Sequence, residues 1–148
     1  MYQTIQTKIM TVKEPSDNIA KTPENVRDLC SDLVELSQES FHILTLNTRN
    51  AVIDRHMIAL GLTNACLVHP REVFRAAISD AASGVILIHN HPSGNVAPSI
   101  EDIKITRQLI EAGHIIDIPI LDHIILGRHK DQTVFQSLRE DGICQFKV

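Results

Sequence analysis

The chain has no tryptophan and a single tyrosine, Tyr2, so aromatic residues make up only 3% of its 148 residues. Proteins that bind single-stranded nucleic acid stack bases on aromatic side chains and follow the phosphate backbone with a basic groove. The chain has 14 lysine and arginine residues against 18 aspartate and glutamate residues, which gives a net charge of −4. The composition therefore argues against strong nucleic-acid binding by this chain on its own.

Long apolar runs and paired cysteines are also missing. No hydrophobic stretch approaches the ~18 residues that a membrane-spanning helix requires, and the first residues do not resemble a signal peptide. Cys30, Cys66 and Cys144 are odd in number and far apart, with no C-x-x-C pair. This pattern argues against a disulfide framework and against a cysteine-based zinc site. We therefore expect a reduced, cytoplasmic protein without a membrane partner, whose cysteines are buried as small apolar side chains.

Composition and periodicity predict one α/β domain with an antiparallel or mixed sheet. Hydrophobic residues make up 43% of the chain and charged residues 22%, which is ordinary globular usage. We expect residues 1–24 to form a polar N-terminal extension and residues 25–148 to form the domain. The predicted helices begin at Pro23 (with apolar residues recurring to Leu36), cover 70–83 before Gly84, and cover 99–112 before Gly113. The predicted strands cover 41–46, 51–61, 85–91 and 118–126, with further short strands over 133–135 and 143–148.

The spacing of polar residues after one apolar run points to chemistry. Residues 85–88 read as a buried strand, and if this strand continues, His89 and His91 project from the same face. A loop follows, and a helix that starts near Ser99 places Asp102 in its first turn, where it can face back toward the histidines. Two imidazole nitrogens and one carboxylate oxygen suit a zinc ion. Three protein ligands leave its fourth position open for water, as in catalytic zinc sites.

The same residues have purely structural explanations. Ser99 and Asp102 have the spacing of a capping box, in which the serine caps a helix and the acid three residues later binds back. His91 followed by Pro92 also suits a simple turn. The combination of a histidine pair at strand spacing, a proline after it and an acid on the next helix favours a metal site over capping alone.

The motif resembles that of a known family. His89-x-His91-Pro92, followed after six residues by Ser99 and after two more by Asp102, matches the JAMM motif of the MPN-domain metalloproteases. More narrowly, the chain resembles the RadC branch of that superfamily over roughly residues 25–146. The resemblance implies a single MPN domain with a curved, mixed or antiparallel sheet flanked by helices, in a cytidine-deaminase-like layered architecture. It rests on the motif and on the segments LNTRN (46–50), VHPREVF (68–74), IHNHPSG (88–94) and LDHIILG (121–127).

The resemblance also implies roles for the motif residues. One zinc ion per chain would be held by His89, His91 and Asp102, and would activate a water molecule for hydrolysis. Ser99 could donate its hydroxyl to the developing oxyanion, alongside or instead of capping the helix.

A glutamate that works with the metal-bound water lies upstream in JAMM proteins, just before the first core strand. Glu39 occupies the matching position, and would accept the water's proton and deliver it to a leaving amine. Without the resemblance, Glu39 is an ordinary acid in a connecting segment. Glu35 and Glu72 are the alternatives, although Glu72 also suits the first turn of a helix.

Three functions follow from these features. The first is a zinc-dependent hydrolase of peptide or isopeptide bonds, acting on a protein or peptide whose identity the sequence does not specify. The second is a DNA-repair-associated accessory protein, as the family label suggests. RadC proteins commonly carry a helix-hairpin-helix region ahead of the MPN domain, and residues 1–24 are too short for one, so we expect the short form. The third is a non-catalytic MPN interaction module. The sequence gives no indication of oligomeric state.

The remaining polar residues are assigned mainly structural roles. Asp122 and His123 interrupt an apolar strand, and we expect a hydrogen-bonded pair at a sheet edge, with a position behind the metal ligands as the alternative. Surface or capping roles are expected for the other histidines, His42, His56, His69, His114 and His129.

Overall fold

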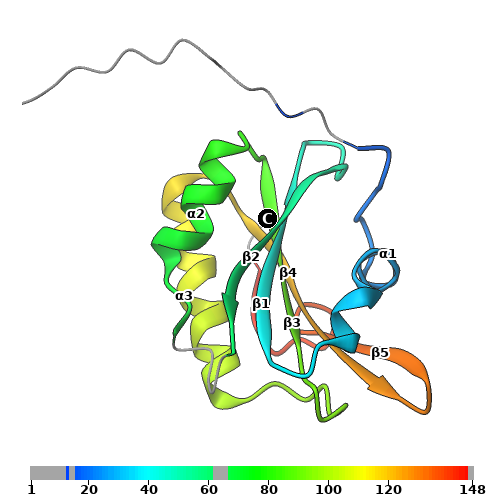
Figure 1. The fold of residues 1–148 in the computed structure, drawn as a ribbon. Coiled ribbons are helices and arrows are strands. Elements are labelled where there is room, and N and C mark those ends of the chain that lie inside the picture. Colours follow the sequence, from blue (N-terminus) through cyan, green and yellow to red (C-terminus); the bar gives the residue numbers. More distant parts are fainter. Residues whose placement is uncertain (1–12, 14–15, 62–66, 147–148) are drawn as a thin grey trace, which may run out of the picture.

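The computed structural model describes residues 13, 16–61 and 67–146, which form one mixed five-stranded sheet with helices on both faces (Figure 1). The strand order is β2-β1-β3-β4-β5; β3 and β4 are parallel and the other neighbours are antiparallel. The expected α/β fold with a mixed sheet is confirmed. The strands are β1 (Ser40–Leu46), β2 (Val52–Leu60), β3 (Gly84–Asn90), β4 (Ile120–His129) and β5 (Gln132–Ser137). The helices are α1 (Pro23–Leu29), the 3-10 helix η1 (Ser31–Glu35), α2 (Pro70–Ser79) and α3 (Ile100–Ile116).

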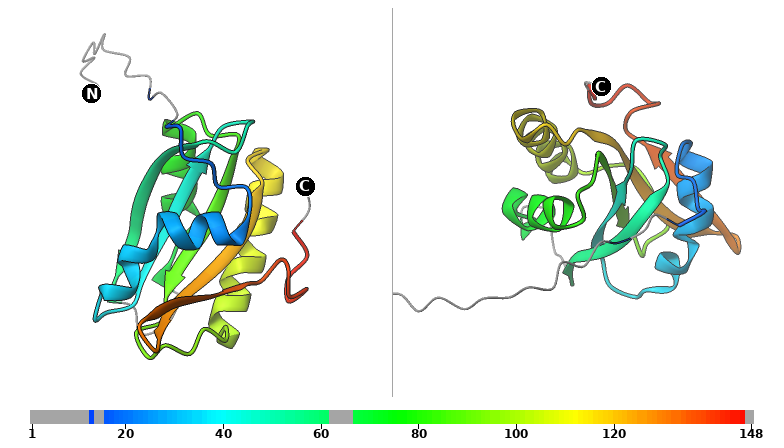
Figure 2. Two further views of the ribbon diagram at one scale, coloured as in Figure 1. Left: turned by 90° about the vertical axis from the view of Figure 1, so that its right-hand side faces the viewer. Right: turned by 90° about the horizontal axis from the view of Figure 1, so that it is seen from above.

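The sheet separates two apolar cores, one on each face. Helices α2 and α3 cover one face and α1 covers the other (Figure 2). Side chains alternate along each strand, so Phe41 and Ile43 of β1 join the core with α2 and α3, whereas Leu44 and Leu46 join the core with α1. This alternation decides which residues at the end of each strand can meet.

Two of the predicted helices end earlier than expected. The start at Thr22-Pro23 is confirmed, since Thr22 caps α1 in a capping box, but α1 ends at Leu29 and the chain continues as η1. Helix α2 ends at Ser79 instead of continuing to residue 83, and Ile78 in its last turn is 59% exposed. The helix cannot continue past Ala81, which has a left-handed φ of 52°, and the Asp80 carboxylate accepts from the Thr45 hydroxyl of β1 and contacts His56 of β2.

Helix α3 is longer than predicted because Gly113 does not end it. The helix continues to Ile116 and ends at Asp117, which adopts the left-handed conformation with φ 66°. A Cβ at Gly113 would lie 2.5 Å from the carbonyl oxygen of Ile118, so the glycine is required by the close return of the chain toward β4. The absence of a side chain at position 113 therefore reflects packing and not helix termination.

The C-terminal strands also differ from prediction. Strand β4 continues to His129 and forms a hairpin with β5, which starts at Gln132 and is longer than the short strand expected there. Residues 143–146 do not form the expected strand, and residues 147–148 lie outside the described part of the chain. Cys30 and Cys144 are buried free thiols, as predicted, while Cys66 falls outside the described residues. No helix among the described residues has the length and apolar character that a membrane crossing requires.

The segment before α1 is attached to the rim of the sheet. Residues 16–20 form backbone hydrogen bonds with residues 50–52 at the start of β2. Lys13 forms ion pairs with Asp54 of β2 and with the fully buried Asp80 carboxylate after α2. The chain therefore packs against the domain on both sides of the isolated β-bridge between Ile19 and Ala51. The domain boundary expected at residue 24 stays a prediction.

Replacing Gly113 by alanine should destabilise the domain. Alanine favours a helix over glycine by about 1 kcal/mol, but forcing its methyl group against the Ile118 carbonyl costs about 1–3 kcal/mol. We expect Gly113→Ala to lower the free energy of unfolding by a net of about 1 kcal/mol, measured by urea unfolding. Gln108→Ala, on the exposed side of α3, should stay within about 0.5 kcal/mol of the parent. A Gly113→Ala variant at least as stable as the parent would show that the chain relaxes around the methyl group.

Candidate metal centre

The centre lies where β3 leaves the sheet beside the parallel strand β4. His89 is the penultimate residue of β3 and is 1% exposed, with its ring 5.8 Å from that of Phe41. His91 lies one residue beyond β3, yet its amide still donates to Leu126 of β4 at 2.8 Å. The strand-like course thus continues through the motif, as the spacing predicts, and the two imidazole rings are 4.8 Å apart.

The loop after the motif turns back tightly against β4. Gly94 has φ +84°, and a Cβ there would collide with the carbonyl oxygen of Arg128. Only glycine satisfies both conditions without strain. The turn brings the carbonyl of Asn95 within 2.7 Å of His91 Nδ1 and leads into the start of α3.

Ser99 and Asp102 form the capping box that their spacing predicts. The Ser99 hydroxyl accepts the Asp102 amide at 3.0 Å, and the Asp102 carboxylate accepts the Ser99 amide at 2.9 Å, which completes a capping box. The same carboxylate faces the histidines, and Asp102 is 1% exposed. Because the Ser99 hydroxyl oxygen acts as an acceptor in the cap, its own proton is left for another acceptor. Within the described residues, that proton has none.

The distances around Asp102 fit ligands that share one ion. Asp102 Oδ1 lies 3.2 Å from His89 Nδ1, and Asp102 Oδ2 lies 3.2 Å from His91 Nε2. Two ligand atoms at ~2.0 Å from a tetrahedral ion are about 3.3 Å apart, whereas a strong hydrogen bond to a carboxylate is about 2.7–2.9 Å long. The Asp102 carboxylate therefore presents one oxygen to each imidazole, while the mutually close group of potential ligand atoms comprises Glu39, His89 and His91 without Asp102.

The hydrogen bonds of the two imidazoles leave nitrogen lone pairs for a ligand. His91 Nδ1 donates to the carbonyl of Asn95, and His91 Nε2 lies 3.2 Å from Asp102 Oδ2. With Nδ1 protonated, Nε2 of the neutral ring would carry the lone pair that a cation needs. Both ring nitrogens of His89 are buried without a hydrogen-bond partner among the described residues. Buried polar atoms without partners are rare, so these nitrogens are candidate metal ligands.

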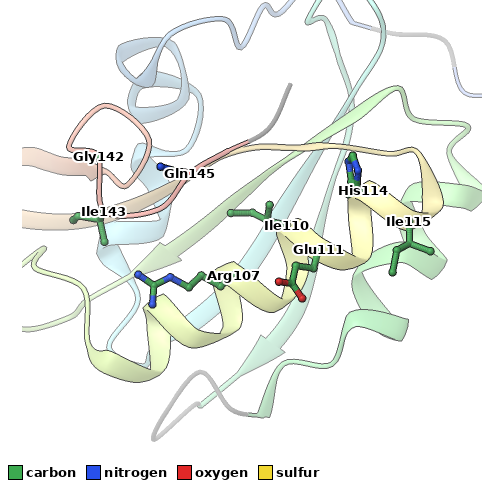
Figure 3. A pocket seen from close by; sticks show the side chains of 8 residues that line it. All are labelled: Arg107, Ile110, Glu111, His114, Ile115, Gly142, Ile143 and Gln145. Atoms are coloured by element: carbon green, nitrogen blue, oxygen red, sulfur yellow. The ribbon is translucent and has the colours of Figure 1, made fainter.

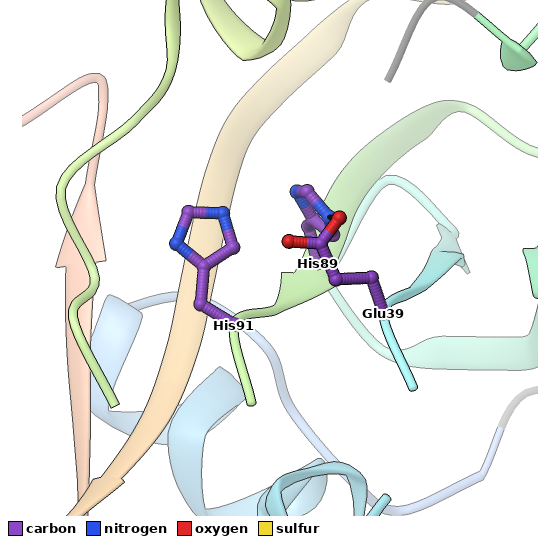
Figure 4. A group of neighbouring side chains, drawn as sticks. All are labelled: Glu39, His89 and His91. Carbon is purple, nitrogen blue, oxygen red and sulfur yellow. Dashed lines mark ion pairs between the residues drawn. The ribbon is translucent and has the colours of Figure 1, made fainter. Parts of the chain in front are cut away.

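Glu39 completes the group from the connection just before β1. Its carboxylate Oε2 lies 3.7 Å from His89 Nε2, and one ligand atom each from Glu39, His89 and His91 lie within 4.8 Å of one another (Figure 4). The Glu39 side chain is 30% exposed, so this acid faces the open side of the centre. The two alternative acids are engaged elsewhere: Glu35 pairs with Arg128, and Glu72 pairs with Arg75 in the first turn of α2.

Local charges keep the carboxylate ionised. Burial alone would raise the pKa of Asp102, but the imidazoles of His89 and His91 beside it, with the amide of Ser99, hold that pKa well below its usual range. Burial likewise opposes the charged form of His91, and the contacts with Asp102 and Asn95 outweigh it, so the pKa of His91 is raised. The centre is thus a buried anion facing imidazoles, which is the electrostatic setting of a cation site.

Comparison with known proteins identifies the family. A family model described as the RadC-like JAB domain matches residues 20–143. The chain belongs to the RadC-like JAB domain family. It is 46% identical to a UPF0758 protein of Listeria monocytogenes over 136 residues, which cover 91% of this chain and 59% of that protein. It is 50% identical to a UPF0758 protein of Bacillus cereus over 123 residues, which cover 82% of this chain and 53% of that protein. The chain thus spans between half and three-fifths of the length of these curated relatives.

Behind the ligand positions, this RadC-like JAB domain has a buried hydrogen-bonded layer. Thr106 donates to the backbone carbonyl of Asp102 at 2.6 Å, and its hydroxyl also contacts Nδ1 of His123 at 2.6 Å. Because the Thr106 proton is used for Asp102, His123 Nδ1 carries the proton in that contact. Burial lowers the pKa of His123 to about 3, so the ring is neutral, and it lies 6.2 Å from the His89 ring.

The expectation that Asp122 and His123 lie at a sheet edge was wrong, because β4 is an interior strand between β3 and β5. Asp122 is hydrogen-bonded as predicted, accepting from the Ser137 hydroxyl at 2.6 Å and from the amide of Arg139. His123 occupies the alternative position, behind the predicted ligand His89, with the two rings 6.2 Å apart. The order of elements in the sequence does not show that β5 pairs with the outer side of β4. For this reason the sequence gives no evidence that β4 is an interior strand.

Another histidine was also misassigned. His42 was expected at the surface, but it is 5% exposed, and its Nε2 lies 2.7 Å from the Ser40 hydroxyl. Ser40 in turn binds the Asn90 side chain, which the sequence did not single out. Burial lowers the pKa of His42 to about 4. The expectation for His69 was correct in part, since it occupies the N-cap position of α2.

A second group of potential ligand atoms lies apart from the motif. Asp54, His56 and Asp80 have ligand atoms within 4.8 Å of one another. The Lys13 ammonium contacts both carboxylates, so an internal cation already balances their charge. We interpret this group as an ion-pair cluster.

A cavity of about 650 Å³ lies between α3 and the segment after β5 (Figure 3). Arg107, Ile110 and His114 line it from the helix, and Ile143 lines it from the other side. The five residues expected at the catalytic centre do not line it, so we do not place the chemistry there.

The low pKa of His42 predicts a loss of stability in acid. Between pH 6.5 and about 4 the unfolded chain binds a proton at this residue and the folded chain does not, so stability falls as the pH falls. At pH 5 this difference is worth about 1–2 kcal/mol. Between pH 7.5 and pH 5, the free energy of unfolding of the native protein should fall by about 1–2 kcal/mol more than that of His42→Gln. Both are measured by urea unfolding in EDTA. His114→Gln, at an exposed position, should behave like the parent, and a His42→Gln variant with the parent's pH dependence would contradict the assignment.

Proposed function

We propose that this RadC-like JAB domain is a zinc-dependent hydrolase that cleaves a peptide or isopeptide bond in a protein or peptide substrate. The observation that carries the proposal is the pair of buried His89 nitrogens without partners, directed toward Asp102 on one side and Glu39 on the other. A site built only for structure would satisfy these atoms with protein hydrogen bonds.

The donor set favours zinc among divalent cations. His89, His91 and Asp102 would hold the ion with two nitrogen atoms and one oxygen atom, a combination typical of catalytic zinc sites. When bound, zinc would polarise the scissile carbonyl and lower the pKa of a coordinated water from about 16 to about 7. His91 is oriented for this role by the Asn95 carbonyl, and Asp102 by the helix cap.

The chain's own residues would then move the protons. Glu39, on the exposed side of the group, accepts a proton from the attacking water as the bond from oxygen to the carbonyl carbon forms. It returns that proton to the amine nitrogen as the carbon–nitrogen bond breaks. Ser99 has an unused hydroxyl proton that it can donate to the carbonyl oxygen as negative charge develops there. No covalent intermediate with the protein is required.

Removing His89 should abolish metal binding. We expect the native protein to hold about one equivalent of zinc and His89→Ala less than about a tenth, because a buried ligand is lost from a three-ligand site. The metal is measured by mass spectrometry after reconstitution and desalting. His114→Ala, an exposed histidine of α3, serves as the matched control and should keep its zinc. A native protein that retains less than half an equivalent would overturn the catalytic proposal.

Removing the base should separate binding from catalysis. We expect Glu39→Gln to keep its zinc and to lose hydrolysis by a factor of roughly 10²–10⁴, because the amide cannot accept the water's proton. Activity is measured on a panel of fluorogenic peptide and isopeptide substrates, one of which the parent cleaves. Glu35→Gln is the matched control. If Glu35→Gln loses activity and Glu39→Gln does not, the role of the base belongs to Glu35.

A further inference from the structure

We propose that Asn90 is a positioning residue that fixes Glu39 beside the two histidines by binding the peptide groups on either side of it. The inference rests on the proposed function, because it assigns a purpose to the residue between two expected metal ligands. In this role Asn90 touches neither the metal nor the substrate.

Asn90 and His89 leave β3 in opposite directions, because successive side chains of a strand point to opposite faces. His89 faces α3 and Asp102. Asn90 faces the other side of the sheet, on the same face as Ile88, which belongs to the core beneath α1. Asn90 is 1% exposed, so its carboxamide must find partners inside the protein.

The partners of this carboxamide are the two peptide groups joined to the Glu39 Cα. Asn90 Oδ1 accepts the backbone amide of Ser40 at 2.7 Å, which belongs to the peptide after Glu39. Asn90 Nδ2 donates to the carbonyl of Gln38 at 2.9 Å, which belongs to the peptide before Glu39. One rigid side chain therefore restricts both backbone dihedrals of Glu39.

A chain of hydrogen bonds holds the Asn90 carboxamide in this orientation. Asn90 Oδ1 can only accept, so the Ser40 hydroxyl donates to it at 2.7 Å. That hydroxyl must then accept from His42, whose Nε2 lies 2.7 Å away and carries the proton of the neutral ring. The buried position of His42 keeps it neutral, because burial lowers its pKa. The network is fully satisfied and fixes the carboxamide against a flip.

Glu39 needs this support because it precedes β1 and lies outside the strand. The carbonyl of Glu39 accepts the Gly61 amide at 2.8 Å, which adds a third anchor to the two from Asn90. The Glu39 carboxylate is thereby held 3.7 Å from His89 Nε2. A displacement of about 1 Å at a reacting group can reduce a rate by roughly 100-fold, so anchoring of this kind has a direct catalytic effect.

The test compares Asn90→Ala with the parent by three measurements. Zinc content should stay near one equivalent, because His89, His91 and Asp102 are unchanged. Hydrogen exchange of the Ser40 amide should accelerate about tenfold or more, because its acceptor is gone, while amides within β1 keep their protection. On a substrate that the parent cleaves, kcat should fall about 10–100-fold with KM within about twofold, since only the geometry of the base has changed.

Asn47→Ala is the matched control. Asn47 lies at the other end of β1 and also accepts two backbone amides with its carboxamide, those of Arg49 and Ala51. We expect this variant to lose stability but to keep the parent's zinc content, Ser40 protection and kcat. A loss of activity in both variants would mean that a weakened sheet, and not the position of Glu39, lowers the rate.

Asn90→Asp provides a variant of the same shape if Asn90→Ala fails to fold. It keeps the oxygen that accepts from Ser40 and replaces the group that donates to Gln38. We expect the Ser40 amide to stay protected and kcat to fall about tenfold, because the peptide before Glu39 is released.

The outcomes separate this inference from the proposed function. If Asn90→Ala keeps kcat within twofold of the parent, or loses half of its zinc, the positioning role is wrong and the hydrolase proposal stands. If Glu39→Gln is as active as the parent, the hydrolase assignment of Glu39 fails. In that case the exchange of the Ser40 amide still decides whether Asn90 anchors this segment.

Discussion

A buried carboxylate constrains the whole centre. Asp102 is 1% exposed, and an isolated ionised carboxylate cannot be placed there without a large desolvation cost. The protein meets this cost with the amide of Ser99, the start of α3, and two imidazoles at 3.2 Å. These groups come from the end of β3 and from the start of α3, so the position of Asp102 requires that β3, the loop after it and α3 meet at one place. A divalent cation bound here, as proposed, would add further positive charge beside the carboxylate.

The alternation of side chains along β3 separates the tasks of the motif. Residues that face α3 meet the metal position, and His89 is one of them. The residue between the histidines faces the opposite core, where a metal ligand would be out of reach but a backbone anchor is useful. Asn90 therefore links the ligand strand to the segment that carries Glu39. The sequence His89-Asn90-His91 thus places the predicted ligand His89 on one face of the sheet, and on the other face the Asn90 side chain that binds the backbone beside Glu39.

The sequence predicted the residues whose spacing is local. His89 and His91 share a strand and Asp102 lies in the first turn of the next helix, so periodicity brings them together without knowledge of the fold. Glu39 lies 50 residues before His89, and only the family resemblance connected the two. The structure adds that β1 and β3 are neighbours and that Phe41 pairs with His89, which places Glu39 beside the histidine.

Features that depend on the order of strands were not predictable in the same way. His42 and His123 were misjudged because polar residues in a strand look the same whether the strand is at an edge or in the interior. The helix end assigned to Gly113 failed for a related reason, since the contact with Ile118 arises only when the chain folds back. Sequence patterns predict helix caps and the periodicity of helices and strands, but they do not predict contacts between segments far apart in the chain.

The two groups with the spacing of metal ligands show why spacing alone does not define a metal site. Asp54, His56 and Asp80 approach one another as closely as the motif residues do, and Lys13 supplies the positive charge between the carboxylates. Around Asp102 the neighbours are imidazoles, and both nitrogens of His89 lack a partner among the described residues. In the first group the Lys13 ammonium lies against both carboxylates, where a cation would otherwise lie. In the second group the His89 nitrogens have no hydrogen-bond partner among the described residues, and an ion bound beside Asp102 would satisfy the nitrogen that faces it.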